Sequence, residues 1–364
     1  MSKRKLLPDK YLVIIYIALL AAGLVAIYGA QTIHEPNEPY FYNHLKLLLM
    51  MLVVNFIILI VPDFFDAIDR FMPAILIGTL LLLIAVLIFG ISVEGSYAKR
   101  WLSIFGVFTI QPSEIAKITL VLYLSSVLAN KGDKLKHVSN GLIPPLIILM
   151  LICLLIMFEP DSGTALLFAL VGFSMFFYGG IPLRYLIVTG ILLGVIFIIF
   201  IINTPYMKAR VTSYLTPHTQ SQEEMYQINR AKLAFNYGGI AGIPDEDIRE
   251  VSTHLPAALT DFIFASIAQR HGFIGDIILL LLFFSFTIRG FIISSGIKDL
   301  FLKNISFGIN IFISAQAYLN MMVATLMLPT TGMPLPFISY GRNALVVNMI
   351  MFAILLKITQ RREE

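Results

Sequence analysis

Asp261 is the residue whose type and position most clearly suggest chemistry. It ends the long polar interruption of an otherwise apolar chain, and Phe262, Ile263 and Phe264 follow it directly. An ionisable group at a boundary between water and lipid is costly, so its presence there indicates a function. Proton transfer is the chemistry that a carboxylate offers most directly.

A second group of candidates lies in the segment SVEGSYAKRWLSIFGVFTIQPSE, where Lys99 and Arg100 stand beside Trp101, the only tryptophan. Arg presents a planar fork that suits phosphate oxygens, and Trp offers a flat face to a sugar ring. The alternative is an aromatic anchor at the membrane surface with two cations reaching for water. Both interpretations remain open from the residues alone.

Further along, Pro112 can begin a helix, and Glu114 and Lys117 then lie three residues apart on one face. They form either a buried ion pair that holds helices together or one wall of a polar pocket in the membrane.

The turn FEPDSGTALL places Asp161 just before an apolar run, where a helix N-cap would explain it. Glu159 beside it leaves open a two-carboxylate site for a divalent cation, Mg²⁺ or Mn²⁺.

Two irregular segments complete the list of candidates. Between residues 223 and 235 the apolar positions fit an interfacial helix loosely, and Gly238, Gly239 and Gly242 then predict mobility or a close backbone approach. The segment 328–343 contains glycines and prolines that exclude a continuous helix. Non-helical backbone at membrane depth survives against protein or a wet cavity, so this segment is expected to line a cleft on the outer side. A plain loop is the alternative.

The composition identifies the element type that must position these residues. Hydrophobic residues make up 58% of the 364 residues and charged residues 13%, far from the roughly 25% charged content of soluble domains. With about 20 apolar residues per crossing, the chain predicts an all-α polytopic membrane protein, a single domain over 1–364. Its ten predicted spans lie near 11–30, 44–61, 71–92, 113–130, 142–158, 162–179, 184–202, 262–288, 303–327 and 343–359, with a long outer loop at 203–260.

An even number of spans places both termini on one side. Lys and Arg gather in the loops of that side, so both termini are expected to be cytoplasmic and the long loop outside. The net charge of +4 largely reflects this asymmetry, and no basic cluster with interleaved aromatics suggests a nucleic-acid partner.

The motifs RWLSIFGVFTIQPSEIAK, EPDSGTALL, YQINRAKLAFNYGG, LPAALTDFIFASI and TGMPLPFISYG, in this order, closely resemble the SEDS family (shape, elongation, division and sporulation), which includes FtsW and RodA. The resemblance implies a peptidoglycan glycosyltransferase that polymerises lipid II at the outer face of the bacterial cytoplasmic membrane beside a class B penicillin-binding protein. It implies Asp261 as the essential acidic residue, and the inverting transfer of a sugar needs a base near the attacking hydroxyl, a role that Asp261 could fill. The predicted substrate-binding residues are Arg100, Trp101, Glu114, Lys117, Asp161, Arg210, Tyr226, Gln227, Ser339 and Arg342.

The chain departs from the family pattern near these motifs. Leu259 stands where members usually carry His, Gln269 and Arg270 replace a Glu pair, and Arg342 and Asn343 follow the SYG motif. Two other functions remain open. A transporter of a lipid-linked precursor would use the same cleft, broken segment and membrane charges. A non-catalytic scaffold would only position the penicillin-binding protein.

Overall fold

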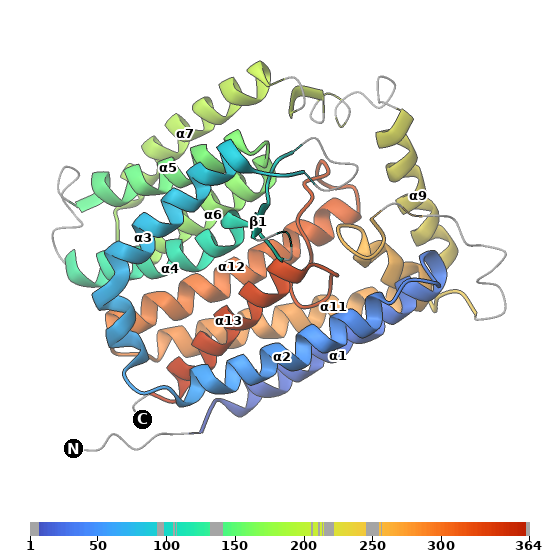
Figure 1. Ribbon diagram of the computed structural model, residues 1–364, viewed down its shortest axis with the longest axis horizontal. Coiled ribbons are helices and arrows are strands. Elements are labelled where there is room, and N and C mark those ends of the chain that lie inside the picture. Colours follow the sequence, from blue (N-terminus) through green and yellow to red (C-terminus); the bar gives the residue numbers. More distant parts are fainter. Residues whose placement is uncertain are drawn as a thin grey trace.

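The computed structural model describes residues 7–92, 98–104, 106, 108–131, 141–204, 207–209, 212, 214, 222–244, 255 and 257–361. Its helices run side by side as a bundle (Figure 1). They are α1 (Lys10–His34), α2 (Tyr40–Ile60), α3 (Phe64–Phe89), α4 (Pro112–Lys131), α5 (Ile143–Phe158), α6 (Ser162–Tyr178), α7 (Leu183–Asn203), α9 (Gln222–Gly238), α11 (Ile263–Ser295), α12 (Leu300–Ala324) and α13 (Arg342–Thr359).

Each predicted span coincides with one of these helices, and the prediction of a polytopic helical membrane protein is confirmed. Within the described residues, eight helices are long and apolar enough to cross a membrane by length and composition. The other two predicted spans, α5 and α6, have 16 and 17 residues. Ten crossings therefore stays a prediction. The boundaries differ most in α3, which begins at Phe64, and in α11, which continues to Ser295. Smaller differences occur in α1, α2 and α12.

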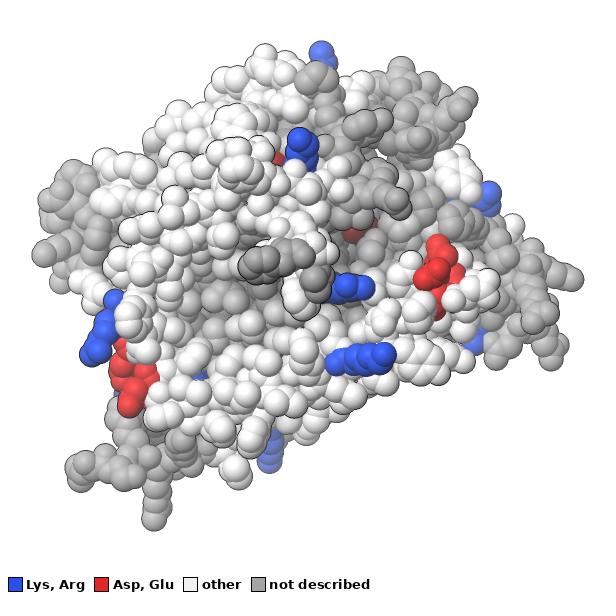
Figure 2. Space-filling model, in the orientation of Figure 1, with Lys and Arg blue, Asp and Glu red and all other residues white. Residues whose placement is uncertain are grey.

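The helices divide into an inner and an outer set. In α12 and α13, 72% and 78% of the membrane-length window is buried, whereas in α7 the share is 6%. Polar side chains in the inner set, such as Gln316, Asn320 and Asn348, are buried among other helices. Uncharged side chains cover most of the face seen in Figure 2. The bundle therefore turns its polar groups inward and its apolar groups toward lipid, as the membrane requires.

The two ends of the described chain meet on one side of the bundle (Figure 1). The Asp9 backbone N–H donates to Thr359 Oγ1 at 3.1 Å, and the Asp9 carboxylate forms an ion pair with Arg289 of α11. The first and last parts of the described chain therefore lie beside one another, and the cytoplasmic location of both termini stays a prediction.

A small element that the sequence analysis missed lies between α3 and α4. Strands β1 (Leu102–Ile104) and β2 (Phe108–Ile110) form an antiparallel hairpin, with Ser103 opposite Thr109. Just before it, Trp101 and Ile91 form an isolated antiparallel bridge. This pairing fixes the backbone on which Arg100 and Trp101 sit.

Helix α11 is interrupted at Gly272, whose φ of 65° and ψ of −168° are not helical. The glycine cluster after α9 packs against this break, backbone to backbone. The Phe273 N–H donates to the Gly239 carbonyl at 2.9 Å, and the Ile243 N–H donates to the Gln269 carbonyl at 3.1 Å. Of the two predictions for the glycines, close backbone approach is confirmed.

Replacing Gly238 with Ala should therefore weaken this junction. An added Cβ would lie 1.9 Å from the Ala268 carbonyl oxygen, and we expect a loss of about 1–3 kcal/mol from overpacking. Thermal unfolding in detergent measures it. The matched control is Gly194→Ala in α7, where a Cβ meets no heavy atom within 4 Å. Equal melting temperatures for the two variants would contradict the tight packing.

Candidate active site

Asp261 lies in the turn that leads into α11, partly exposed. Three hydrogen bonds hold this turn from outside. Asn320 Nδ2 of α12 donates to the Asp261 backbone carbonyl at 3.0 Å, and Ser339 Oγ donates to the Thr260 carbonyl at 2.6 Å. The Tyr340 N–H donates to the Leu259 carbonyl at 2.8 Å. The carboxylate thus stands on a backbone fixed by α12 and by the segment 325–341.

Apolar packing supports the same turn from the side of α9. Ala258, Phe262 and Ala265 form a buried cluster with Ala231 and Ala234 of α9. The small side chains allow α9 to approach closely, so the segment 222–244 braces the turn that carries Asp261.

Arg100 is fastened to the turn between α5 and α6. Its Nη2 donates to the Pro160 carbonyl at 2.6 Å, its Nε donates to the Glu159 carbonyl at 3.3 Å, and its Nη1 lies 3.4 Å from Asp161 Oδ2. Asp161 also caps α6, accepting from the Thr164 N–H at 3.2 Å. The predicted N-cap is confirmed, and the same carboxylate orients the guanidinium.

Arg100 and Asp261 come close together beside Gly332. A Cβ built on Gly332 would lie 3.7 Å from Arg100 Nη1 and 3.7 Å from Asp261 Oδ2. The φ of this glycine is +77°, which L residues rarely adopt. A cation and a carboxylate from distant segments therefore border one small space, and the glycine leaves that space open.

Glu114 and Lys117 form the buried ion pair that was one of the two predicted interpretations. Lys117 Nζ lies 2.7 Å from Glu114 Oε1 and donates to Gln316 Oε1 at 2.8 Å. Gln316 Nε2 in turn donates to the Pro334 carbonyl at 2.8 Å. Lys117 is only 2% exposed. The pair is therefore buried, and Gln316 links it to the segment 325–341. Contact of either residue with substrate stays a prediction.

The segment 325–341 is not helical. The broken backbone predicted for 328–343 is thus found, but it begins three residues earlier, and residues 342 and 343 already belong to α13. The segment is anchored at both sides. Asn320 Nδ2 also donates to the Met333 carbonyl at 2.7 Å, and Ser339 Oγ accepts from the Leu335 N–H at 2.8 Å. Gln316 and Asn320 were missed by the sequence analysis. Two amides four residues apart share one face of a predicted span, and that spacing could have identified them.

The remaining predicted residues lie around this centre or outside it. Trp101 is half-buried beside Arg100, Tyr226 is 40% exposed on α9 with Arg230 over its ring, and Gln227 is half-buried on that helix. Arg342 is exposed at the first position of α13. Arg210 lies outside the described residues.

Comparison with known proteins now places the chain. Residues 10–364 match the model of the FtsW/RodA/SpoVE family, described as cell cycle proteins. The chain belongs to this family.

Curated members of the FtsW/RodA/SpoVE family align with the chain over almost its whole length. A probable peptidoglycan glycosyltransferase FtsW from Geobacter sulfurreducens is 32% identical over 357 residues, which cover 97% of this chain and 95% of the relative. The stage V sporulation protein E of Bacillus subtilis is 30% identical over 363 residues, covering 99% of both.

A solved structure has the same fold. It is described as "Structural coordination of polymerization and crosslinking by a peptidoglycan synthase complex" and is similar with a TM-score of 0.79 and 25% identity, over 98% of this chain and 99% of that one.

In the described part of the chain, no group of three or more His, Cys, Asp or Glu residues could hold a metal ion. Glu159 and Asp161 remain a pair. The Mg²⁺ or Mn²⁺ ion stays a prediction for this member of the FtsW/RodA/SpoVE family.

Glu159 is 1% exposed, and neither of its carboxylate oxygens has a hydrogen-bond partner among the described residues. Burial, followed by the nearby charge of Asp161, raises the pKa of Glu159 from 4.5 to about 8, against the opposing effect of Arg100. The folded protein therefore holds this proton more tightly than the unfolded chain does.

Glu159 should make the stability of the protein depend on pH. As pH rises from 4.5 to about 8, the unfolded chain releases the proton before the folded protein does, so stability falls across that window. Glu159→Gln should remove this component, leaving stability unchanged near pH 4.5 and raising it at pH 8. Thermal unfolding at several pH values measures the effect. Parallel pH profiles for the wild type and the variant would contradict it.

Proposed function

We propose that this protein is a peptidoglycan glycosyltransferase that polymerises lipid II into glycan strands. The single observation that carries the proposal is the space beside Gly332, which Asp261 and Arg100 both border. A carboxylate beside a fixed cation suits a reaction that removes a proton at one atom and releases a negative charge at another. The names of the curated relatives agree with this activity.

The chemistry assigns the two residues different roles. The 4-hydroxyl of one sugar attacks the anomeric carbon of another, a new C–O bond forms, and the bond from that carbon to the lipid diphosphate breaks with inversion. Asp261 takes the hydroxyl proton. Arg100 lies where it can stabilise the departing diphosphate, since Asp161 and the Pro160 carbonyl already hold its guanidinium in place.

Position in the cell belongs to the same proposal. The excess of Lys and Arg on the side of the termini supports cytoplasmic ends in the bacterial inner membrane and a site on the outer face. A class B penicillin-binding protein is the proposed partner, because the similar solved structure is a synthase complex that polymerises and crosslinks. A divalent cation held near Glu159 and Asp161 would add positive charge for the diphosphate.

Asp261→Asn should lower lipid II polymerisation by about 10²- to 10⁴-fold, the usual contribution of a general base. The assay uses the purified protein with its penicillin-binding partner and lipid II, with products resolved by gel. Asp66→Asn, an exposed position on α3, is the control and should polymerise normally. Wild-type polymerisation by Asp261→Asn would refute catalysis by this residue. Loss of lipid II translocation in proteoliposomes with intact polymerisation would favour a transporter instead.

Gly332→Ala should lower polymerisation by about a hundredfold, because a methyl group would occupy the space between Arg100 and Asp261. The matched control is Gly180→Ala. Its φ of +86° gives the same kind of backbone strain, and a Cβ there meets no atom within 4 Å. That control should retain activity with a similar loss of thermal stability. If both variants polymerise equally well, the space beside Gly332 is not the reaction site.

A further inference from the structure

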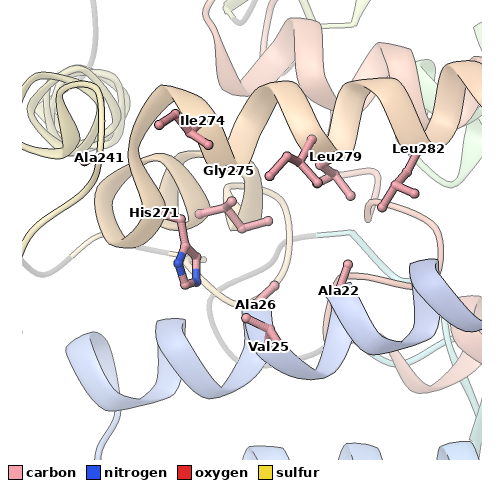
Figure 3. A pocket seen from close by; sticks show the side chains of 11 residues that line it. Ala22, Val25, Ala26, Ala241, His271, Ile274, Gly275, Leu279 and Leu282 are labelled. Carbon is pink, nitrogen blue, oxygen red and sulfur yellow. The ribbon is translucent and has the colours of Figure 1, made fainter.

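A groove of about 310 Å³ runs between α1 and α11, away from the space beside Gly332. Figure 3 shows α1 below and α11 above it, with Val25 and Ala26 turned toward His271. Its lining is apolar except for His271, and Val25, Ile274 and Ile278 are each more than half exposed. In a membrane-spanning helix pair such side chains face lipid, so the groove opens sideways into the hydrocarbon region.

The groove is joined to the candidate active site by one short helix. The part of α11 before its break at Gly272 begins directly after the turn of Asp261, and it places Ile267 and His271 in the groove wall. At about 1.5 Å per residue, nine residues of helix span about 13 Å. Beyond the break, Ile274, Ile278 and Leu282 continue the wall along the membrane-spanning part of α11.

The groove and the turn of Asp261 are placed so that one lipid-linked sugar could reach both. A molecule whose sugar hydroxyl lies at Asp261 and whose lipid chain lies in the groove must bridge the length of that short helix, about the length of a disaccharide. His271 is the one polar side chain that lines the groove, and it lies at the end of the groove that is nearer to Asp261 along the chain. The groove floor contains Ala22, Ala26 and Gly275, which leave room for the methyl branches of an isoprenoid chain.

We infer that this groove binds the isoprenoid tail of the acceptor, the lipid-linked disaccharide whose hydroxyl attacks, while the donor's diphosphate lies at Arg100. The inference rests on the proposed function and deepens it, since it separates the two lipid substrates. The surroundings of the tail are equally apolar in the bilayer and in the groove. The groove therefore holds the tail by packing and not by the hydrophobic effect.

The first test fills the groove. Val25→Trp should raise the KM for full-length lipid II at least about threefold, the size of a typical packing interaction in membranes, and leave kcat unchanged. A lipid II analogue with a tail too short to reach Val25 should show no such difference. Ile17→Trp, exposed on α1 outside the groove, is the matched control, and Ile278→Trp repeats the test from α11. Equal KM values for groove and control variants would overturn the inference.

The second test measures binding without turnover. Asp261→Asn protein in liposomes is irradiated with lipid II carrying a diazirine on its isoprenoid tail, and labelled peptides are mapped. Label is expected within 22–26 and 274–282, reduced by unlabelled lipid II and not by phosphatidylglycerol. Label only at other segments, or equal competition by phosphatidylglycerol, would overturn the inference. Because labelling needs no polymerisation, a groove label with a fully active Asp261→Asn protein would refute the proposed catalysis and leave the groove standing.

Discussion

The constraint on which the rest of the structure depends is the need to satisfy polar backbone in the segment 325–341. Lipid offers no hydrogen bonds, so backbone that leaves the helix at membrane depth must find its partners in protein. Two amides of α12 provide them, since Gln316 donates to the Pro334 carbonyl and Asn320 donates to the Met333 carbonyl. Asn320 also donates to the Asp261 carbonyl. The interaction that stabilises the unwound segment therefore also fixes the turn of the candidate base.

The ion pair of Glu114 and Lys117 extends this network into α4. Taking two charges out of water is expensive, and a buried pair is tolerated only when further hydrogen bonds complete it. Lys117 meets that condition by donating to Gln316 as well as to Glu114, whereas Glu114 Oε2 is buried with no hydrogen-bond partner among the described residues. Removing either charge would leave the other buried and unpaired, so the pair acts on the site through α12. Among the described cations, this leaves Arg100 as the one that borders the space beside Gly332.

Sequence reasoning went furthest where a pattern is local. Apolar runs predicted the helices, the Asp161 carboxylate was predicted as an N-cap, and the glycines and prolines of 328–343 predicted broken backbone at the right place. The sequence could not predict which distant segments meet. Neither the approach of Arg100 to Asp261 nor the docking of α9 on the break at Gly272 has a signal in spacing, because both depend on tertiary packing. The hairpin at Leu102–Ile110 was missed because three-residue strands carry too little alternation to detect.

At two positions that depart from the family pattern, Leu259 and Gln269, the surrounding structure is held by hydrogen bonds to the backbone and not to the side chain. Leu259 contributes its carbonyl to the Tyr340 N–H and Gln269 contributes its carbonyl to the Ile243 N–H, bonds that any side chain permits. Both side chains are buried, and Gln269 is fully so. Neither amide atom of Gln269 has a hydrogen-bond partner among the described residues, and a neutral amide in such a place costs less than an unpaired carboxylate would. Arg342 differs, since it is exposed at the start of α13. The backbone hydrogen bonds that position the turn of Asp261 therefore do not depend on the side chains at these positions.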